Sequence, residues 1–144
     1  MTANTTSRKR AGSQRTGYAV AAVINAVLLY LINGRPGWEA VPFLTGETER
    51  VLTLMNVSLL AGLVANLIYF VRLESWVVPA GGIVTTGIGL AVLIGFWHVS
   101  PFDFGAASLW TPAVRILLVV GIVGTVIAIP VQIVSLIGRI RRPR

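Results

Sequence analysis

Four long apolar segments, separated by shorter polar ones, dominate the hydrophobicity pattern of this chain. About 20 consecutive apolar residues are enough to cross the hydrocarbon core of a bilayer as an α-helix. The pattern therefore predicts membrane-spanning helices over residues 17–33, 51–71, 76–99 and 113–138. The fold class we expect is an all-α membrane protein, an antiparallel four-helix transmembrane bundle forming one domain over residues 17–138.

The second, third and fourth spans carry small residues at helical spacing, which is typical of faces where transmembrane helices approach closely. In the third span, glycine and threonine recur every four residues and predict a central helix or a dimer seam. Pro130 removes one backbone hydrogen bond from the fourth span and predicts a kink there. The predicted packing positions are Ser58, Gly62, Gly81, Thr85, Gly89, Gly121 and Gly124.

Two longer connections, residues 34–50 and 98–111, each contain a Pro-Phe pair and a tryptophan. They are too apolar to be freely solvated, so we expect them to fold over one end of the bundle. Their shared composition is a weak signal of an internal repeat. Thr45 is predicted to cap the second helix, and Thr111, followed by Pro112, is predicted to cap the fourth.

Basic residues gather at the two ends of the chain and predict its topology. Residues 1–16 and 139–144 hold eight of the 12 Lys and Arg residues, whereas the longer connections hold most of the 5 acidic residues. Because basic flanks of membrane spans stay in the cytoplasm, we expect a multi-pass cell-membrane protein with both termini cytoplasmic. Residues 1–16 are expected to be a disordered basic tail, and residues 139–144 a second basic tail.

Composition excludes an ordinary soluble domain. Only 12% of the residues are charged, 55% are hydrophobic, and the mean hydropathy is +0.80, whereas soluble chains carry about 25% charged residues. The net charge of +7 suggests nucleic-acid binding as a hypothesis. No aromatic residues are interleaved with the basic ones to stack on bases, which argues against it. The expected partners are instead the lipid bilayer and its anionic headgroups, and no nucleic acid.

The single histidine, His98, and the single aspartate, Asp103, lie in the same connection. A carboxylate beside a histidine can orient it for acid–base chemistry. Arg115 is close enough along the chain to pair with Asp103, and a salt bridge holding the loop to the fourth helix is the favoured interpretation. No metal or cofactor is predicted, because catalytic zinc needs three convergent protein ligands and cysteine is absent.

Three asparagines, Asn25, Asn56 and Asn66, lie within the predicted spans. An amide in lipid needs a polar partner, so Asn25 is expected to face another helix. In size and number of spans the chain is similar to the small multidrug-resistance exporters, which depend on a glutamate in their first span. The polar residue of this first span is Asn25, and that assignment is rejected.

The expected function is that of a non-enzymatic accessory subunit or homo-oligomer in a larger membrane complex, acting through helix packing. An alternative is a small transporter or ligand-binding protein with a polar site under the two Pro-Phe loops. A third hypothesis, an enzyme on the external face, requires His98 within hydrogen-bonding reach of a carboxylate. The candidate residues of the polar site are Asn25, Asn56, Asn66, His98, Asp103 and Arg115.

Overall fold

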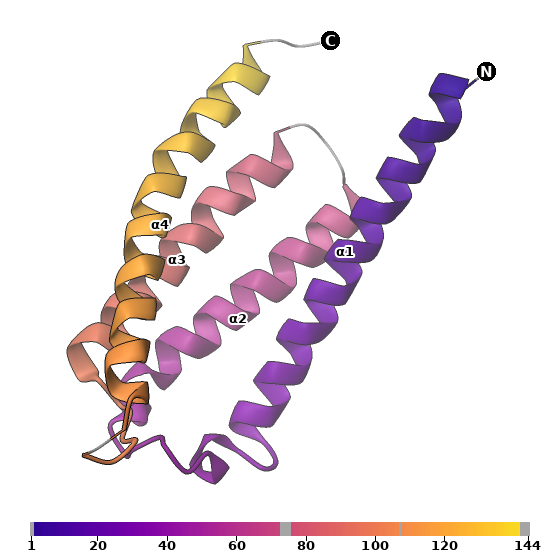
Figure 1. The fold of residues 1–144 in the computed structure, drawn as a ribbon. Coiled ribbons are helices and arrows are strands. Elements are labelled where there is room, and N and C mark those ends of the chain that lie inside the picture. The colour runs from indigo at the N-terminus through magenta and orange to yellow at the C-terminus, as the bar shows by residue number, and fades with distance from the viewer. Residues whose placement is uncertain (1, 73–75, 107, 142–144) are drawn as a thin grey trace.

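A computed structural model of the chain describes residues 2–72, 76–106 and 108–141. Four long α-helices and one short 3-10 helix make up its regular structure within these ranges (Figure 1). Their bounds are α1 Thr2–Asn33, η1 Trp38–Ala40, α2 Thr48–Val71, α3 Val77–Val99 and α4 Trp110–Ile140.

The all-α antiparallel bundle predicted from the sequence is confirmed. Each long helix is long and apolar enough to cross a membrane, and the four helices alternate in direction along the chain (Figure 1). Observed and predicted ends agree within three residues for α2, α3 and α4. Pro130 lies inside α4, and the helix continues beyond it to Ile140.

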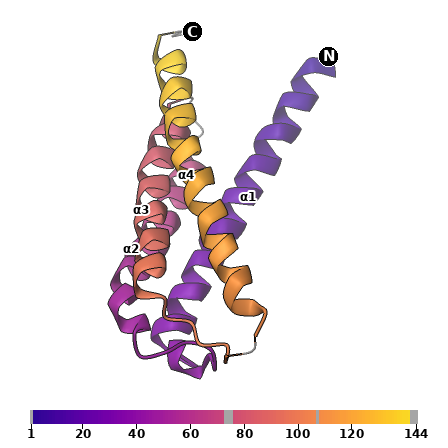
Figure 2. The same cartoon turned by 60° about the vertical axis from the view of Figure 1, so that its left-hand side comes forward.

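The bundle is an open row of helices. Contacts join α1 to α2, α2 to α3, and α3 to α4, but within the described residues α1 and α4 do not contact each other. Figures 1 and 2 show both longer loops at one end of the molecule, while the two termini lie apart at the other end. Within the described residues, the helices at the two ends of the row, α1 and α4, therefore have one long helix each as a neighbour.

The prediction of disorder for residues 1–16 is wrong for residues 2–16, which form the first turns of α1. These turns project beyond the end of α2 (Figures 1 and 2). The stretch contains arginine, lysine, alanine and glutamine and no proline, all compatible with a helix. Extending the helix of the first span also needs no new nucleation step, so the segment continues it.

Neither predicted threonine cap is formed. Helix α2 begins after Glu47 without a side-chain cap, because the hydroxyl of Thr45 donates instead to the carbonyl of Pro101 at 3.2 Å. Helix α4 begins at Trp110, before Thr111, and the hydroxyl oxygen of Ser108 accepts the Trp110 N–H at 3.2 Å. A tertiary hydrogen bond thus occupies the Thr45 hydroxyl, and the first N–H of α4 binds a hydroxyl that precedes the N-cap residue Leu109.

Candidate functional site

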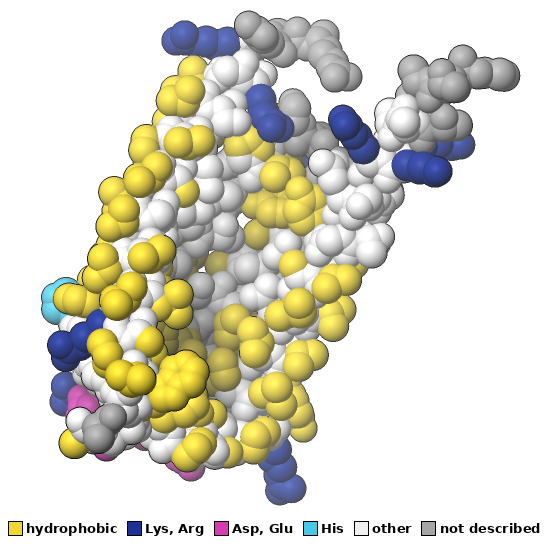
Figure 3. All heavy atoms as spheres, viewed as in Figure 1, with side chains coloured by type: hydrophobic (Ala, Val, Ile, Leu, Met, Phe, Trp, Pro, Cys, Tyr) yellow, Lys and Arg dark blue, Asp and Glu magenta, His cyan; other side chains and the backbone are white. Residues whose placement is uncertain are grey.

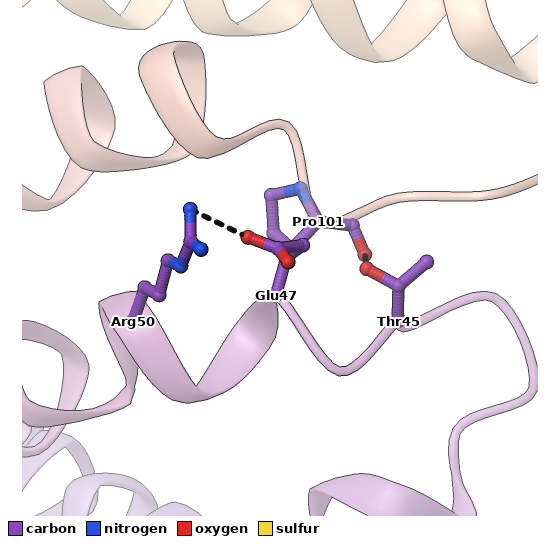
Figure 4. A network of polar contacts seen from close by, with 4 residues as sticks. All are labelled: Thr45, Glu47, Arg50 and Pro101. Atoms are coloured by element: carbon purple, nitrogen blue, oxygen red, sulfur yellow. Dashed lines mark hydrogen bonds and ion pairs between the residues drawn. The ribbon is translucent and has the colours of Figure 1, made fainter.

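The two Pro-Phe loops meet at the end of the bundle as a short antiparallel pair. Leu44 and Phe102 form an isolated β-bridge. The N–H of Thr45 donates to the carbonyl of Pro101 at 2.9 Å, and the N–H of Asp103 donates to the carbonyl of Phe43 at 2.8 Å. Figure 4 shows the Thr45 side chain directed at the same Pro101 carbonyl. The sequence prediction that both loops fold over one end is confirmed, and the structure adds that they bind each other.

Aromatic rings line the paired loops on one side. The rings of Phe43 and Phe104 stack with centroids 5.1 Å apart, and those of Phe102 and Phe104 stack at 6.0 Å. Phe102 also lies 5.4 Å from Phe96, on the last turn of α3. Such ring pairs contribute about 0.5–1.5 kcal/mol each beyond the area they bury. The loops are thus joined by backbone hydrogen bonds and by a continuous stack of rings that reaches α3.

The start of α2 forms the most tightly buried contact in the described part of the protein. Thr48 is 0% exposed, Val51 is 1% exposed, and Pro101 from the other loop is also fully buried. A methyl group placed on Gly95 of α3 would lie 3.3 Å from Cγ1 of Val51. Gly95 was not among the predicted packing positions, although Ala91 stands four residues before it and gives the same small-residue spacing.

A cavity of about 560 Å³ lies beneath the stacked rings, between the loops and helices α3 and α4. Every side chain that lines it is apolar. The sequence predicted a polar site under the loops. A space does lie there, but its lining is hydrophobic, so the prediction of polar chemistry is wrong. The lining residues are Phe43, Leu93, Phe96, Phe102, Phe104, Trp110, Val114, Leu117 and Leu118.

The predicted ion pair between Asp103 and Arg115 does not form between these two described residues. A carboxylate oxygen of Asp103 accepts the N–H of Gly105 at 2.9 Å, a local turn that holds it within its own loop. The Arg115 side chain lines a separate pocket of about 210 Å³ beside Trp97 and Ser100. Sequence proximity allowed the pair, but the local backbone partner is nearer to the Asp103 side chain.

His98 does not join this carboxylate either. Its Nδ1 lies 3.0 Å from the carbonyl oxygen of Ile94, one turn earlier on α3, a spacing that fits a proton on Nδ1. The ring is exposed at the end of the helix. In the same region Glu47 forms an ion pair with Arg50 at 2.9 Å (Figure 4). Both of these side chains are well exposed, so this pair stabilises the fold very little.

The three asparagines lie along the seam between α1 and α2, in two separate places. Asn56 exchanges two hydrogen bonds with Asn33, at 2.7 and 2.8 Å. Asn25 faces Gly62 of α2, as expected, since a methyl group there would lie 2.9 Å from its Oδ1. Its Nδ2 nevertheless donates to the carbonyl of Ala21 on its own helix at 2.8 Å. Asn66 likewise donates to its own helix, at the Gly62 carbonyl at 2.7 Å.

A second polar seam joins α3 to α4. The amide of Gln132 donates to the hydroxyl of Thr86 at 3.1 Å, and that hydroxyl lies 3.3 Å from the amide oxygen of Gln132. The amide and hydroxyl groups of both seams therefore bind protein atoms. None of them lines the cavity beneath the loops, and the six residues predicted as one polar site are not brought together.

The predicted packing glycines fall into two groups. Gly62 meets Asn25, Gly81 meets the ring of Tyr69, and Gly121 would place a methyl group 3.3 Å from Leu93. At these three positions the neighbouring helix leaves little or no room for a larger side chain.

Gly89 and Gly124 differ from them, because nothing lies within 4 Å of a methyl group built at either position. Thr85 lines a pocket between α2 and α3, and its hydroxyl donates to the Gly81 carbonyl on its own helix at 3.0 Å. Ser58 is half-buried on α2. Gly89 and Gly124 are thus not packing positions within a single chain.

The described residues contain no group of three or more His, Cys, Asp or Glu side chains placed to hold a metal ion. No protein-family model, curated protein or solved structure matches the chain.

Proposed function

We propose that this chain is a non-enzymatic multi-pass membrane protein that acts by associating, through its helices, with a second copy or another membrane subunit. The observation that carries the proposal is the open row of helices. Helix α4 packs on α3 alone within the described residues, and Gly124 lies on its surface with open space around it. In lipid, small residues at such positions let a neighbouring backbone approach closely, which favours association.

The same proposal places both termini in the cytoplasm. In Figure 3 Lys and Arg side chains are visible at both ends of the molecule, whereas the visible Asp and Glu side chains lie at the loop end. The loop end holds Arg35, Arg50 and Arg115, and the described basic residues of the two tails lie at the end where the chain begins and finishes. This asymmetry follows the positive-inside distribution of membrane proteins. Each basic residue near an anionic membrane surface contributes about 1 kcal/mol of attraction, so the basic ends would bind headgroups of the cytoplasmic leaflet.

A test of association compares two changes on the same helix. Gly124→Leu fills the open surface, whereas Val119→Leu adds bulk on another face of α4, where Val119 is already 45% exposed. We expect Gly124→Leu to weaken self-association by more than about tenfold, the effect of losing 1.4 kcal/mol of contact, with Val119→Leu like the wild type. The measurement is oligomeric mass in detergent and bicelles, together with the set of proteins retained from native membranes.

Gly121→Leu is the matched control for folding, because its side chain would enter the contact with Leu93 inside the chain. It should lower stability, whereas Gly124→Leu should leave the helical content and the unfolding transition unchanged. If Gly124→Leu, correctly folded, kept the oligomeric mass and every co-purifying partner of the wild type, association through this face would be refuted.

The transporter and enzyme alternatives have less support. A transporter needs polar groups that can exchange protein partners for a substrate, and Asn56 and Gln132 are each engaged in an interhelical pair. An external enzyme needs His98 near a carboxylate, and its Nδ1 contacts a backbone carbonyl instead. The cavity beneath the loops favours a ligand-binding role, but for an apolar molecule.

A further inference from the structure

The cavity beneath the paired loops has a preformed roof. Hydrogen bonds between the loops hold Thr45 to Pro101 and Asp103 to Phe43, and the stacked rings of Phe43, Phe102 and Phe104 lie against one another. The cavity has a volume of about 560 Å³, within the range typical of small-molecule sites. A site of this size with a fixed roof needs little rearrangement to accept a ligand.

The chemistry of the walls excludes a polar ligand. Two backbone hydrogen bonds join the loops, and the roof side chains that line the cavity are aromatic rings rather than donors and acceptors. The floor consists of apolar side chains of α3 and α4, among them Leu93, Val114 and Leu117. Apolar cavities bind hydrocarbon, as an enclosed cavity of about 150 Å³ does with benzene.

We propose that this cavity binds one acyl chain of a phospholipid from the leaflet on the side of the Pro-Phe loops. The volume accommodates a hydrocarbon several times larger than benzene. The floor belongs to helices that are long and apolar enough to cross a membrane, so the neighbouring medium is itself lipid. In Figure 3 apolar side chains crowd the loop end of the hollow between α1 and α4, where a chain can enter sideways.

A partner helix fits this space less well than an acyl chain. A helix with its side chains is about 10–12 Å across and runs through the full thickness of the membrane. The stacked rings of Phe43, Phe102 and Phe104 close the loop end of the cavity and would block such a path. A flexible chain can end beneath the rings while its headgroup stays at the membrane surface.

The experiment uses the full chain in detergent and a phosphatidylcholine that carries a photoreactive diazirine on one acyl chain. After irradiation, labelled peptides are located by mass spectrometry, with unlabelled phosphatidylcholine as competitor. The test variant is Val114→Trp, which fills the cavity. Its matched control is Val123→Trp, the same change on the opposite side of α4, where Val123 is 51% exposed. Leu117→Phe is a second, milder cavity variant, and helical content and unfolding are measured for all three.

The proposal predicts saturable labelling of cavity residues such as Phe104, Trp110 and Leu117, which the competitor suppresses. Val114→Trp should reduce it by more than about tenfold, the effect of displacing roughly two methylene groups from the site, and Val123→Trp should not. Labelling that does not saturate, or that spreads evenly over the lipid-facing residues of α4, overturns the proposal. So does absent labelling combined with a change in oligomeric mass for Val114→Trp, which would assign the cavity to a second copy. Neither result bears on association through Gly124.

Discussion

The reciprocal amide pair between Asn33 and Asn56 permits a quantitative test of how α1 is held to α2. Each amide donates one hydrogen bond to the other, at 2.8 and 2.7 Å. Asn33 is the last residue of α1, and its side chain is exposed, so water and headgroups can compete for it. The perturbation is replacement of each asparagine by leucine, singly and together.

The expected coupling energy follows from these two bonds. Interhelical hydrogen bonds in membrane proteins contribute about 0.6 kcal/mol each on average, which gives about 1.2 kcal/mol for the pair. Exposure of Asn33 lowers this, so we expect about 0.5–1 kcal/mol. Asn33→Leu leaves the Asn56 amide without its partner, whereas in Asn56→Leu the Asn33 amide keeps its bond to the Leu29 carbonyl at 2.9 Å. Because the two side chains share their bonds, the losses of the two single variants should together exceed the loss of the double variant.

The assay is a double-mutant cycle measured by reversible unfolding in mixed micelles and followed by circular dichroism. The matched control cycle pairs Asn33→Leu with Asn66→Leu, because Asn66 donates only to its own helix at the Gly62 carbonyl. That cycle should be additive within about 0.3–0.5 kcal/mol. A coupling of zero between Asn33 and Asn56, or an equal coupling in the control cycle, would refute the reasoning.

Two further substitutions test single features of the structure. Tyr69→Phe should raise the free energy of unfolding by about 1 kcal/mol, because the Tyr69 hydroxyl is buried without a hydrogen-bond partner; a loss of stability on thermal unfolding would mean that this hydroxyl has a partner. Arg115→Gln should change stability by less than about 0.5 kcal/mol, with no coupling to Asp103→Asn, because the two side chains form no ion pair. A measured coupling of about 1 kcal/mol or more between the two substitutions would support the Asp103–Arg115 salt bridge that the sequence predicted.

The sequence predicted most of the fold because hydrophobicity is a local property, readable residue by residue. Four apolar runs with short polar connections determine four helices, their order and their alternating direction. The same local reasoning failed for residues 2–16, whose polar composition indicated disorder. A helix that already exists can continue through a polar segment at little cost, and composition does not register this cooperativity.

The candidate site was only partly predictable, because its parts depend on pairing across the chain. The apolar character of both Pro-Phe loops indicated that they cover one end of the bundle. Only the fold decided that Thr45 and Pro101, 56 residues apart, would bind each other and leave an apolar cavity below. In the tertiary structure the Asp103 carboxylate accepts the N–H of Gly105 instead of pairing with Arg115. The turn of the loop places this backbone group closest to the carboxylate.

Helix rotation decided which small residues are used. By sequence alone Gly121 and Gly124 are equivalent members of a packing face, yet Gly121 meets Leu93 and Gly124 meets open space. Three residues correspond to about 300° around a helix, so the two positions differ by about 60° in direction. The sequence by itself determined which segments enter the membrane, whereas their relative rotation, which depends on all the contacts at once, determined which faces remain for a partner.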